Sequence, residues 1–177
     1  MNAQEFTKLW QNDEKSPIIK FQLKTDMAAG LSEETASILQ NYGLPRTAEP
    51  WLSFMEFMIV DDSVSCALKG LNYYPVGYLA NGDIICIDMT TEKLMICDHE
   101  DMSYTWMLNA SIGSLYESLI LFRDFIAEVN EKNPDYSNNF KIPDGMLDVL
   151  ADKLKNADNE SYENEGFWYT EIQALGD

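Results

Sequence analysis

The sequence predicts an α+β fold with an antiparallel sheet of about four to six strands. Three observations support this prediction. Apolar residues recur at helical spacing near the start and in the last third of the 177-residue chain, whereas the middle has short apolar runs separated by turns. An Asn-Gly pair stands between two of these runs, which favours a β-hairpin. Hydrophobic residues make up 46% of the chain, which is enough for a packed core.

Two helices are predicted before the sheet. The first ends before Pro17, and its apolar stripe is Phe6, Leu9 and Trp10. The second begins after Ser32, a good N-cap residue. It ends at Gly43, which suits the left-handed conformation of a helix C-terminus, and Pro45 prevents continuation. Its buried stripe is predicted to be Ile38, Leu39 and Tyr42.

The sheet is predicted to begin after Trp51. Apolar residues between positions 54 and 60 predict a first strand, and Asp61-Asp62-Ser63 predicts a turn. Residues 64–68 predict a second, weaker strand. This part of the chain therefore enters the sheet as two short strands.

A tight hairpin is predicted at Asn81-Gly82, because this pair accepts the two positive φ angles of a type I′ turn. The flanking strands are residues 76–80 and 83–88. A loop of only Asn81 and Gly82 then sets the pairing. The predicted pairs are Tyr78 with Ile85, Val76 with Ile87 and Leu79 with Ile84.

Two more strands are predicted, at residues 94–98 and 104–109. An even-length loop joins the hairpin to the first of them. The predicted pairs are Ile87 with Ile96 and Cys86 with Cys97. Because the strands at residues 83–88 and 94–98 are apolar on both faces, we expect these two in the middle of the sheet.

Helices return in the last third of the chain. Apolar residues recur at helical spacing up to Asn133-Pro134, where the first of these helices is predicted to end. A second, long helix and a short terminal helix are separated by the acidic stretch 158–165. The predicted starts are a capping box of Ser114 with Glu117 for the first and Ile142-Pro143-Asp144 for the second.

The charge balance is strongly acidic. Thirty Asp and Glu against twelve Lys and Arg give a formal net charge of −18. We expect no nucleic-acid partner and no membrane partner, because both are anionic and are bound through Lys and Arg. No acid lies between Ser63 and Gly82, so the charge gathers in loops and in the last third. Two interpretations stay open: a basic protein partner, or acidity that only maintains solubility.

The sequence gives no sign of targeting. The first residues lack a basic stretch followed by an apolar one, and the apolar runs are much shorter than the roughly 20 residues of a membrane span. Three cysteines do not make a disulfide framework. We therefore expect a cytoplasmic protein.

The residues do not indicate catalysis. His99 is the only histidine, and no nucleophile is predicted across from it. The most specific candidate for a metal site is the set Cys86, Cys97 and His99. However, the two cysteines lie in apolar strands and lack Cys-x-x-Cys spacing. We expect them to be buried thiols. No calcium-loop spacing or phosphate-binding glycine loop occurs, so we expect no enzyme activity, no cofactor and no metal.

Five short motifs follow one another from about residue 30 onward. They are Gly43-Leu44-Pro45, Trp51-Leu52-Ser53-Phe54, Val76-Gly77 with Gly82-Asp83-Ile84-Ile85-Cys86-Ile87-Asp88, Asn109-Ala110-Ser111, and Phe167-Trp168. In this order they resemble the SUKH superfamily of bacterial immunity proteins, especially its fourth subfamily. Each motif alone is unspecific, and the order of all five carries the resemblance.

The resemblance implies an α+β fold with helices packed against a curved antiparallel sheet. It implies a single domain over residues 1–177, with residues 1–30 as an N-terminal extension that matches none of the motifs. It also implies a non-catalytic immunity protein that binds and neutralises a polymorphic toxin encoded nearby. Because the superfamily includes regulatory interaction proteins, a housekeeping module without a toxin partner is the alternative.

No contact position follows from the resemblance, so partner contacts are predicted from charge. We expect a basic toxin, such as a nuclease domain, bound through acidic residues and a few aromatic side chains. A DNA-mimicking inhibitor would need carboxylates regularly spaced on one face. The periodic apolar pattern of the chain argues against this type of inhibitor. The predicted contact residues, unless they are only a solvated face, are Asp61, Asp62, Asp98, Glu100, Asp101, Glu160, Glu163 and Glu165.

Overall fold

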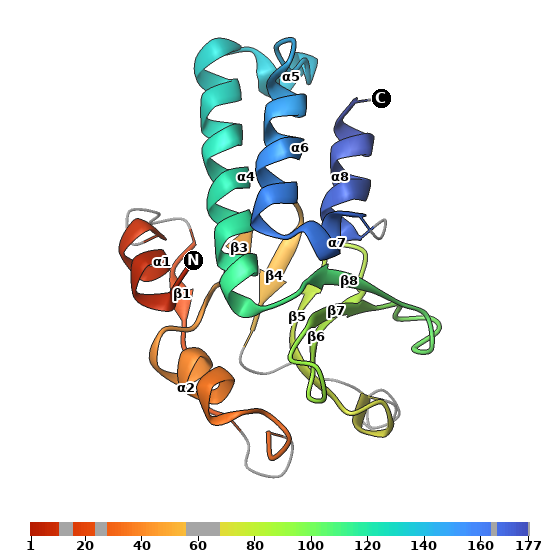
Figure 1. Cartoon of the computed structure of the whole chain (residues 1–177). Coiled ribbons are helices and arrows are strands. Elements are labelled where there is room, and N and C mark those ends of the chain that lie inside the picture. Colours follow the sequence, from red (N-terminus) through yellow and green to blue (C-terminus); the bar gives the residue numbers. More distant parts are fainter. Residues whose placement is uncertain (11–15, 24–27, 56–67, 164–165, 177) are drawn as a thin grey trace.

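The computed structural model describes residues 1–10, 16–23, 28–55, 68–163 and 166–176, except for the side chain of Glu163. It confirms the α+β class, with a six-stranded antiparallel sheet and a separate two-stranded one (Figure 1). The large sheet is formed by β3 (Thr47–Ala48), β4 (Leu52–Phe54), β5 (Tyr73–Leu79), β6 (Ile84–Asp88), β7 (Leu94–Cys97) and β8 (Thr105–Asn109). Each of these strands pairs with the next along the chain, and β1 (Ile18–Ile19) pairs with β2 (Leu44–Pro45).

The helices precede and follow the large sheet, as expected. Those in the described part are α1 (Ala3–Trp10), α2 (Glu33–Asn41), α4 (Ile112–Lys132), α5 (Tyr136–Asn139), α6 (Met146–Ala157), α7 (Asn159–Glu163) and α8 (Phe167–Gly176). In Figure 1, α4, α6 and α8 stand side by side above the sheet, while α1 lies beside the lower half of α4 and α2 lies below it. None of the described helices is both long enough and apolar enough to cross a membrane.

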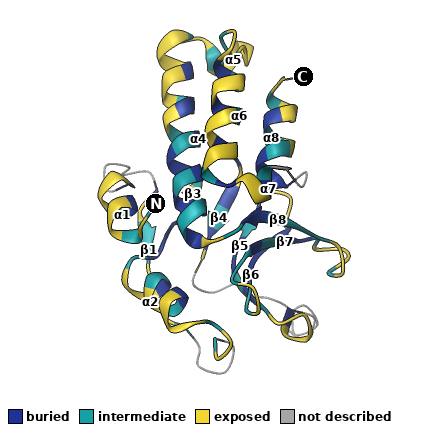
Figure 2. Ribbon diagram, in the orientation of Figure 1, coloured by how far each residue is buried: buried dark blue, intermediate teal, exposed yellow. Residues whose placement is uncertain are grey.

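The core uses both faces of the central strands. Ile85, Ile87 and Ile96 belong to the main cluster with the helices, whereas Cys86 and Cys97 belong to a smaller cluster on the opposite face. Figure 2 shows the buried residues concentrated in the strands and on the inner sides of the helices. The prediction that these strands lie in the middle of the sheet is confirmed.

The β5–β6 hairpin has a longer loop than predicted. The backbone bonds Leu79 N to Asp83 O, at 2.8 Å, and Gly82 N to Leu79 O, at 2.9 Å, leave residues 80–82 as the loop. Gly82 has a φ of 99°, whereas Asn81 is not among the residues with positive φ, so the two-residue type I′ turn is not formed. This is the hairpin in which a type I turn is followed by a left-handed glycine.

The predicted pairs across this hairpin are therefore wrong. The observed pairs are Tyr78 with Ile84, Gly77 with Ile85 and Tyr74 with Ile87. A bulge at Val76 shifts the register once more between Pro75 and Gly77. It lets Val76 and Leu79, which are three positions apart, both enter the main core, which strict alternation would forbid.

The predicted pairing of the next two strands is wrong by two residues. The observed pairs are Ile85 with Ile96, Ile87 with Leu94 and Cys86 with Met95. The bond from Asp88 N to Lys93 O, at 2.9 Å, closes the loop at residues 89–92. Because a shift of two keeps every side chain on its face, Cys86 and Cys97 still meet, with their sulfur atoms 4.0 Å apart.

The ends of α2 are as expected, but the predicted starts of α4 and α6 are not, since α6 begins at Met146 and not at Ile142-Pro143-Asp144. Ser32 caps α2, and Gly43 after it has a φ of 76°. However, α4 begins after Ser111 and not at Ser114. The Oγ of each serine accepts a bond from the backbone N of the other, both at 3.1 Å, so Ser114 is the third residue of the capping box.

Part of the predicted sheet entry lies outside the described residues. Phe54 is in β4, but residues 56–67 are not described, and with them the predicted turn at Asp61-Asp62-Ser63. Leu68, the end of the second predicted strand, lies in a helical stretch of residues 68–70. That end of the prediction is wrong.

Candidate partner-binding site

Three predicted contact residues share the loop between β7 and β8. The Asp98 carboxylate accepts bonds from the backbone N of Glu100, at 2.7 Å, and of Asp101, at 3.0 Å. Asp101 in turn accepts bonds from the N and Oγ of Ser103, which lower its pKa below the ordinary value. The loop is therefore held by its own acids, and the Glu100 side chain is left exposed to solvent.

A buried carboxylate connects this loop to the β5–β6 hairpin. Asp83 Oδ1 lies 2.8 Å from His99 Nδ1 and accepts a bond from the His99 backbone N at 3.1 Å. Burial raises the pKa of Asp83, but the bonds from His99 and Asn81 outweigh it and the net pKa is lowered. The hydrogen bond to Asp83 raises the pKa of His99. His99 thus acts here as a structural partner of Asp83, a carboxylate that the sequence prediction missed.

The only metal-like cluster in the described part of the chain is Asp83, Asp98 and His99, whose ligand atoms lie within 4.8 Å of one another. Asp83 Oδ1 and His99 Nδ1 already bond to each other, and Asp98 Oδ1 accepts the bonds of its own turn. The cluster does not include Cys86 and Cys97. The Cys86 thiol is buried, and burial with the neighbouring Cys97 raises its pKa well above the ordinary value. Both cysteines pack as small apolar side chains.

The other predicted contact residues do not join this loop. Glu160, in α7, forms an ion pair with Lys93 in the β6–β7 loop, at the end of β7 opposite to Asp98. The predicted residues Asp61, Asp62 and Glu165, and the side chain of Glu163, lie outside the described part. Among the described residues, the predicted acidic set is therefore divided between the two ends of β7.

The tryptophans have different environments. Trp10 and Trp168 are buried in the core, whereas Trp51 is 65% exposed in the short connection between β3 and β4. Trp51 also has a φ of 62°, an unfavourable backbone region for a bulky side chain. Tyr104, next to the acidic loop, is 63% exposed, with its ring centroid 5.6 Å from that of Trp106. Trp51 and Tyr104 are the exposed aromatic side chains nearest to the sheet.

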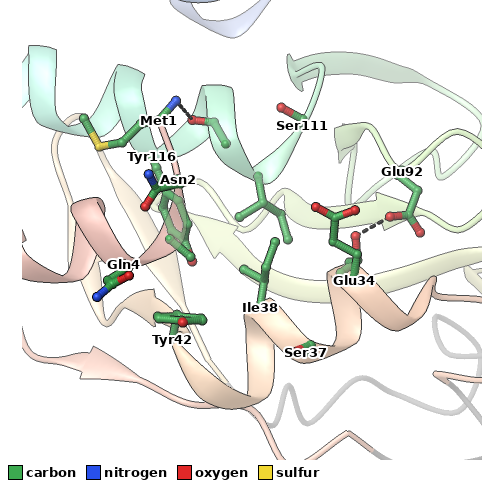
Figure 3. A pocket seen from close by; sticks show the side chains of 14 residues that line it. Met1, Asn2, Gln4, Glu34, Ser37, Ile38, Tyr42, Glu92, Ser111 and Tyr116 are labelled. Carbon is green, nitrogen blue, oxygen red and sulfur yellow. Dashed lines mark hydrogen bonds between the residues drawn. The ribbon is translucent and has the colours of Figure 1, made fainter.

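An open cleft of about 710 Å³ lies between α1, α2 and the first turn of α4 (Figure 3). Ile38, Tyr42 and Ile112 provide apolar lining, and residues 1–4 form one wall. Figure 3 shows the Glu34 side chain extending from α2 into the cleft, near Glu92. The sequence prediction missed this site, because its walls come from segments far apart in the chain, such as Met1 and Gly113, which are 112 positions apart.

Glu92 fixes the α2 side of the cleft. It has a φ of 61° in the β6–β7 loop, and its carboxylate accepts bonds from Ser32 N, at 2.9 Å, from Ser32 Oγ, at 2.8 Å, and from Thr35 Oγ1. Burial raises the pKa of Glu92, but these bonds lower it by more, so the group is a carboxylate at neutral pH. A second negative charge therefore lies beside Glu34.

Two of the motifs meet at one buried carboxylate. Asp158 Oδ2 accepts bonds from Asn109 Nδ2, at 2.9 Å, from Ala110 N and from Ser114 Oγ, both at 2.7 Å. Asn109 Oδ1 accepts a bond from Trp168 Nε1 at 2.9 Å. These contacts join the start of α4 to the α6–α7 junction and to α8. The residues of both motifs are thus structural and are not free for a partner.

The chain was compared with known proteins. A family model described as SUKH-4 immunity protein matches residues 17–174. No curated protein and no solved structure matches. The matched range contains all five motifs and every described strand, and it leaves α1 outside.

Proposed function

The chain belongs to the SUKH-4 immunity protein family, and on this premise we propose that it binds a cognate polymorphic toxin and neutralises it by occlusion. The family match over residues 17–174 is the observation that carries the proposal. The geometry agrees with it, because acids and exposed aromatic side chains stand on a scaffold held by buried hydrogen bonds. On this proposal the chain works in the cytoplasm and has no catalytic step of its own.

The charge supports a basic toxin, and we take a nuclease domain as the first candidate. A formal charge of −18 accelerates the approach of a basic partner and disfavours acidic ones. The proposed contacts in the described part are Glu100 and Asp101, with Tyr104 beside them as an aromatic contact, and Glu160 at the other end of β7. On the sequence alone we add Asp61, Asp62, Glu163 and Glu165.

The test is co-expression with the toxin domain encoded next to this chain. We expect cells that express the toxin to survive only when this chain is also produced. We also expect the two purified proteins to form a stable complex in size-exclusion chromatography. If the toxin kills equally well with and without the chain, the proposal is wrong, and a regulatory interaction module takes its place.

A further inference from the structure

The cleft between α1, α2 and α4 has the size and lining of a binding site. Its volume of about 710 Å³ is within the roughly 300–1,000 Å³ typical of ligand sites. Ile38 and Tyr42 are half-buried on the α2 side, so each still offers apolar surface to an incoming group. Such a surface suits the aliphatic stem of a long side chain.

The charge in the cleft is negative and partly unpaired. Glu34 is exposed and extends into the cleft, and within the described residues its carboxylate has no hydrogen bond or ion pair (Figure 3). Glu92 beside it is ionised. The ammonium group of Met1 lies at the rim, but it already pairs with Glu117 at 3.1 Å. A cation that enters the cleft therefore meets one free carboxylate and a second negative charge.

We propose that this cleft receives a lysine or arginine side chain of the toxin, with Glu34 as its ion-pair partner and Ile38 and Tyr42 against its aliphatic stem. The inference rests on the proposed function and adds a contact that charge alone did not predict. A carboxylate next to apolar surface favours a basic side chain over an acidic or purely apolar one.

The position of the cleft suits specificity for one toxin. Residues 1–4, which form one wall, lie outside the range 17–174 that matches the family model. The opposite wall, from α2 and α4, lies inside that range. The cleft thus combines the common scaffold with a segment that the family model does not describe, so its shape and charge can distinguish one partner from another.

Glu33 and Glu34 provide a matched pair of variants. Both are exposed acids in the first turn of α2, but only Glu34 lines the cleft. Glu33→Gln and Glu34→Gln remove the same charge at adjacent positions, so long-range attraction changes equally in both. We expect Glu34→Gln to weaken the Kd for the purified toxin domain by at least about tenfold, and Glu33→Gln to change it by less than about threefold.

Ser37 and Gln40 provide a second pair with the opposite change. Ser37 lines the cleft one helical turn after Glu34, whereas Gln40 is exposed on the same helix and does not line it. In Ser37→Arg, the new guanidinium can pair with Glu34 and fill the cleft. We expect Ser37→Arg to weaken binding at least about tenfold and Gln40→Arg to leave it within about threefold.

The titrations use isothermal calorimetry on variants whose thermal unfolding matches that of the unchanged chain. If Glu34→Gln binds as well as Glu33→Gln, and Ser37→Arg as well as Gln40→Arg, the cleft inference is wrong while the proposed function stands. If the unchanged chain neither binds the toxin nor protects cells, both are wrong. Loss of binding in only the two cleft variants supports the inference.

Discussion

At the residue scale, the Asp158 carboxylate joins the end of β8, the start of α4 and α7. Its two carboxylate oxygens accept bonds from Asn109, Ala110, Ser114 and Ser161. In Asp158→Asn, the amide NH2 would face the Ser161 backbone N, which is also a donor, and the negative charge would be lost. We expect the free energy of unfolding to fall by about 2–4 kcal/mol. Urea denaturation measures this change.

The matched control is Asp152→Asn. Asp152 is an exposed residue of α6, so the same chemical change there leaves no buried donor without an acceptor. We expect its free energy of unfolding to stay within about 0.5 kcal/mol of the unchanged chain. Equal effects of the two substitutions would contradict the role given to Asp158.

The same carboxylate predicts a pH dependence. Burial raises the pKa of Asp158, but its hydrogen bonds lower it by more, so the folded-state pKa is below the ordinary value. A depressed pKa contributes stability above the unfolded-state value of about 3.9, and this contribution is lost as the pH falls through the folded-state pKa. The difference in unfolding free energy between the unchanged chain and Asp158→Asn should therefore shrink below about pH 4. Urea denaturation from pH 7 to pH 3 measures it, and a constant difference would contradict the prediction.

No sequence pattern predicts the Asp158 network. Asn109 and Asp158 are 49 positions apart, and each alone fits an ordinary polar position beside a helix. The acidic stretch 158–165 has the composition of a solvated segment, yet its first residue is only 6% exposed. A buried carboxylate becomes recognisable only when the fold brings its donors together, and the same is true of Asp83.

At the element scale, α1 is part of the core although it lies outside the family match. Phe6 is fully buried, and its ring stacks on that of Tyr116 in α4 with centroids 4.0 Å apart. Tyr116 donates a bond of 2.6 Å to Gly43 O, so α1 packs on the side chain that joins α4 to the end of α2. Phe6→Ala should lower the free energy of unfolding by about 3–5 kcal/mol.

Phe140→Ala is the control for α1, because Phe140 is 73% exposed at the end of α5. Its removal should change the free energy of unfolding by less than about 0.5 kcal/mol. We propose that residues 1–177 form one domain that includes α1. Circular dichroism and tryptophan fluorescence should then report a single coincident urea transition, and a small effect of Phe6→Ala would show α1 to be an appended segment.

The elements also show which boundaries a sequence can predict. The α2 ends were predicted because Ser32 and Gly43 act through contacts within a few residues. The predicted start of α4 was wrong because Ser111 and Ser114 are both good N-cap residues. The sequence alone does not show which of the two serines caps the helix. The predicted register of the β5–β6 hairpin was wrong for a different reason. The observed register depends on the bulge at Val76, which lets Val76 and Leu79 both enter the core, and on the bond from Leu79 N to Asp83 O that makes the loop three residues long.

At the scale of the whole molecule, acidic side chains lie at both ends of the large sheet. Asp98, Glu100 and Asp101 lie at one end of β7, whereas Glu92 and Glu160 lie near the other, with Glu34 close to Glu92. The composition predicted a basic partner but not this distribution, because neighbours across a sheet depend on the register. A toxin that touches both the cleft and the β7–β8 loop must therefore extend from one end of β7 to the other.

The net charge predicts how association with the toxin responds to salt. The 30 acids far outnumber the twelve basic residues, so the molecule attracts a basic partner at long range. Salt screens such attraction within about 8–10 Å at ordinary ionic strength.

We expect the association rate constant to fall by at least about tenfold between roughly 0.05 and 0.5 M NaCl, and the dissociation rate constant to change much less. Stopped-flow tryptophan fluorescence measures the association rate, because Trp51, one of the four tryptophans, is exposed to a partner. Glu33→Gln serves as a control that should keep nearly the same salt dependence. If the association rate constant does not change with salt, the toxin surface that binds this chain is not basic.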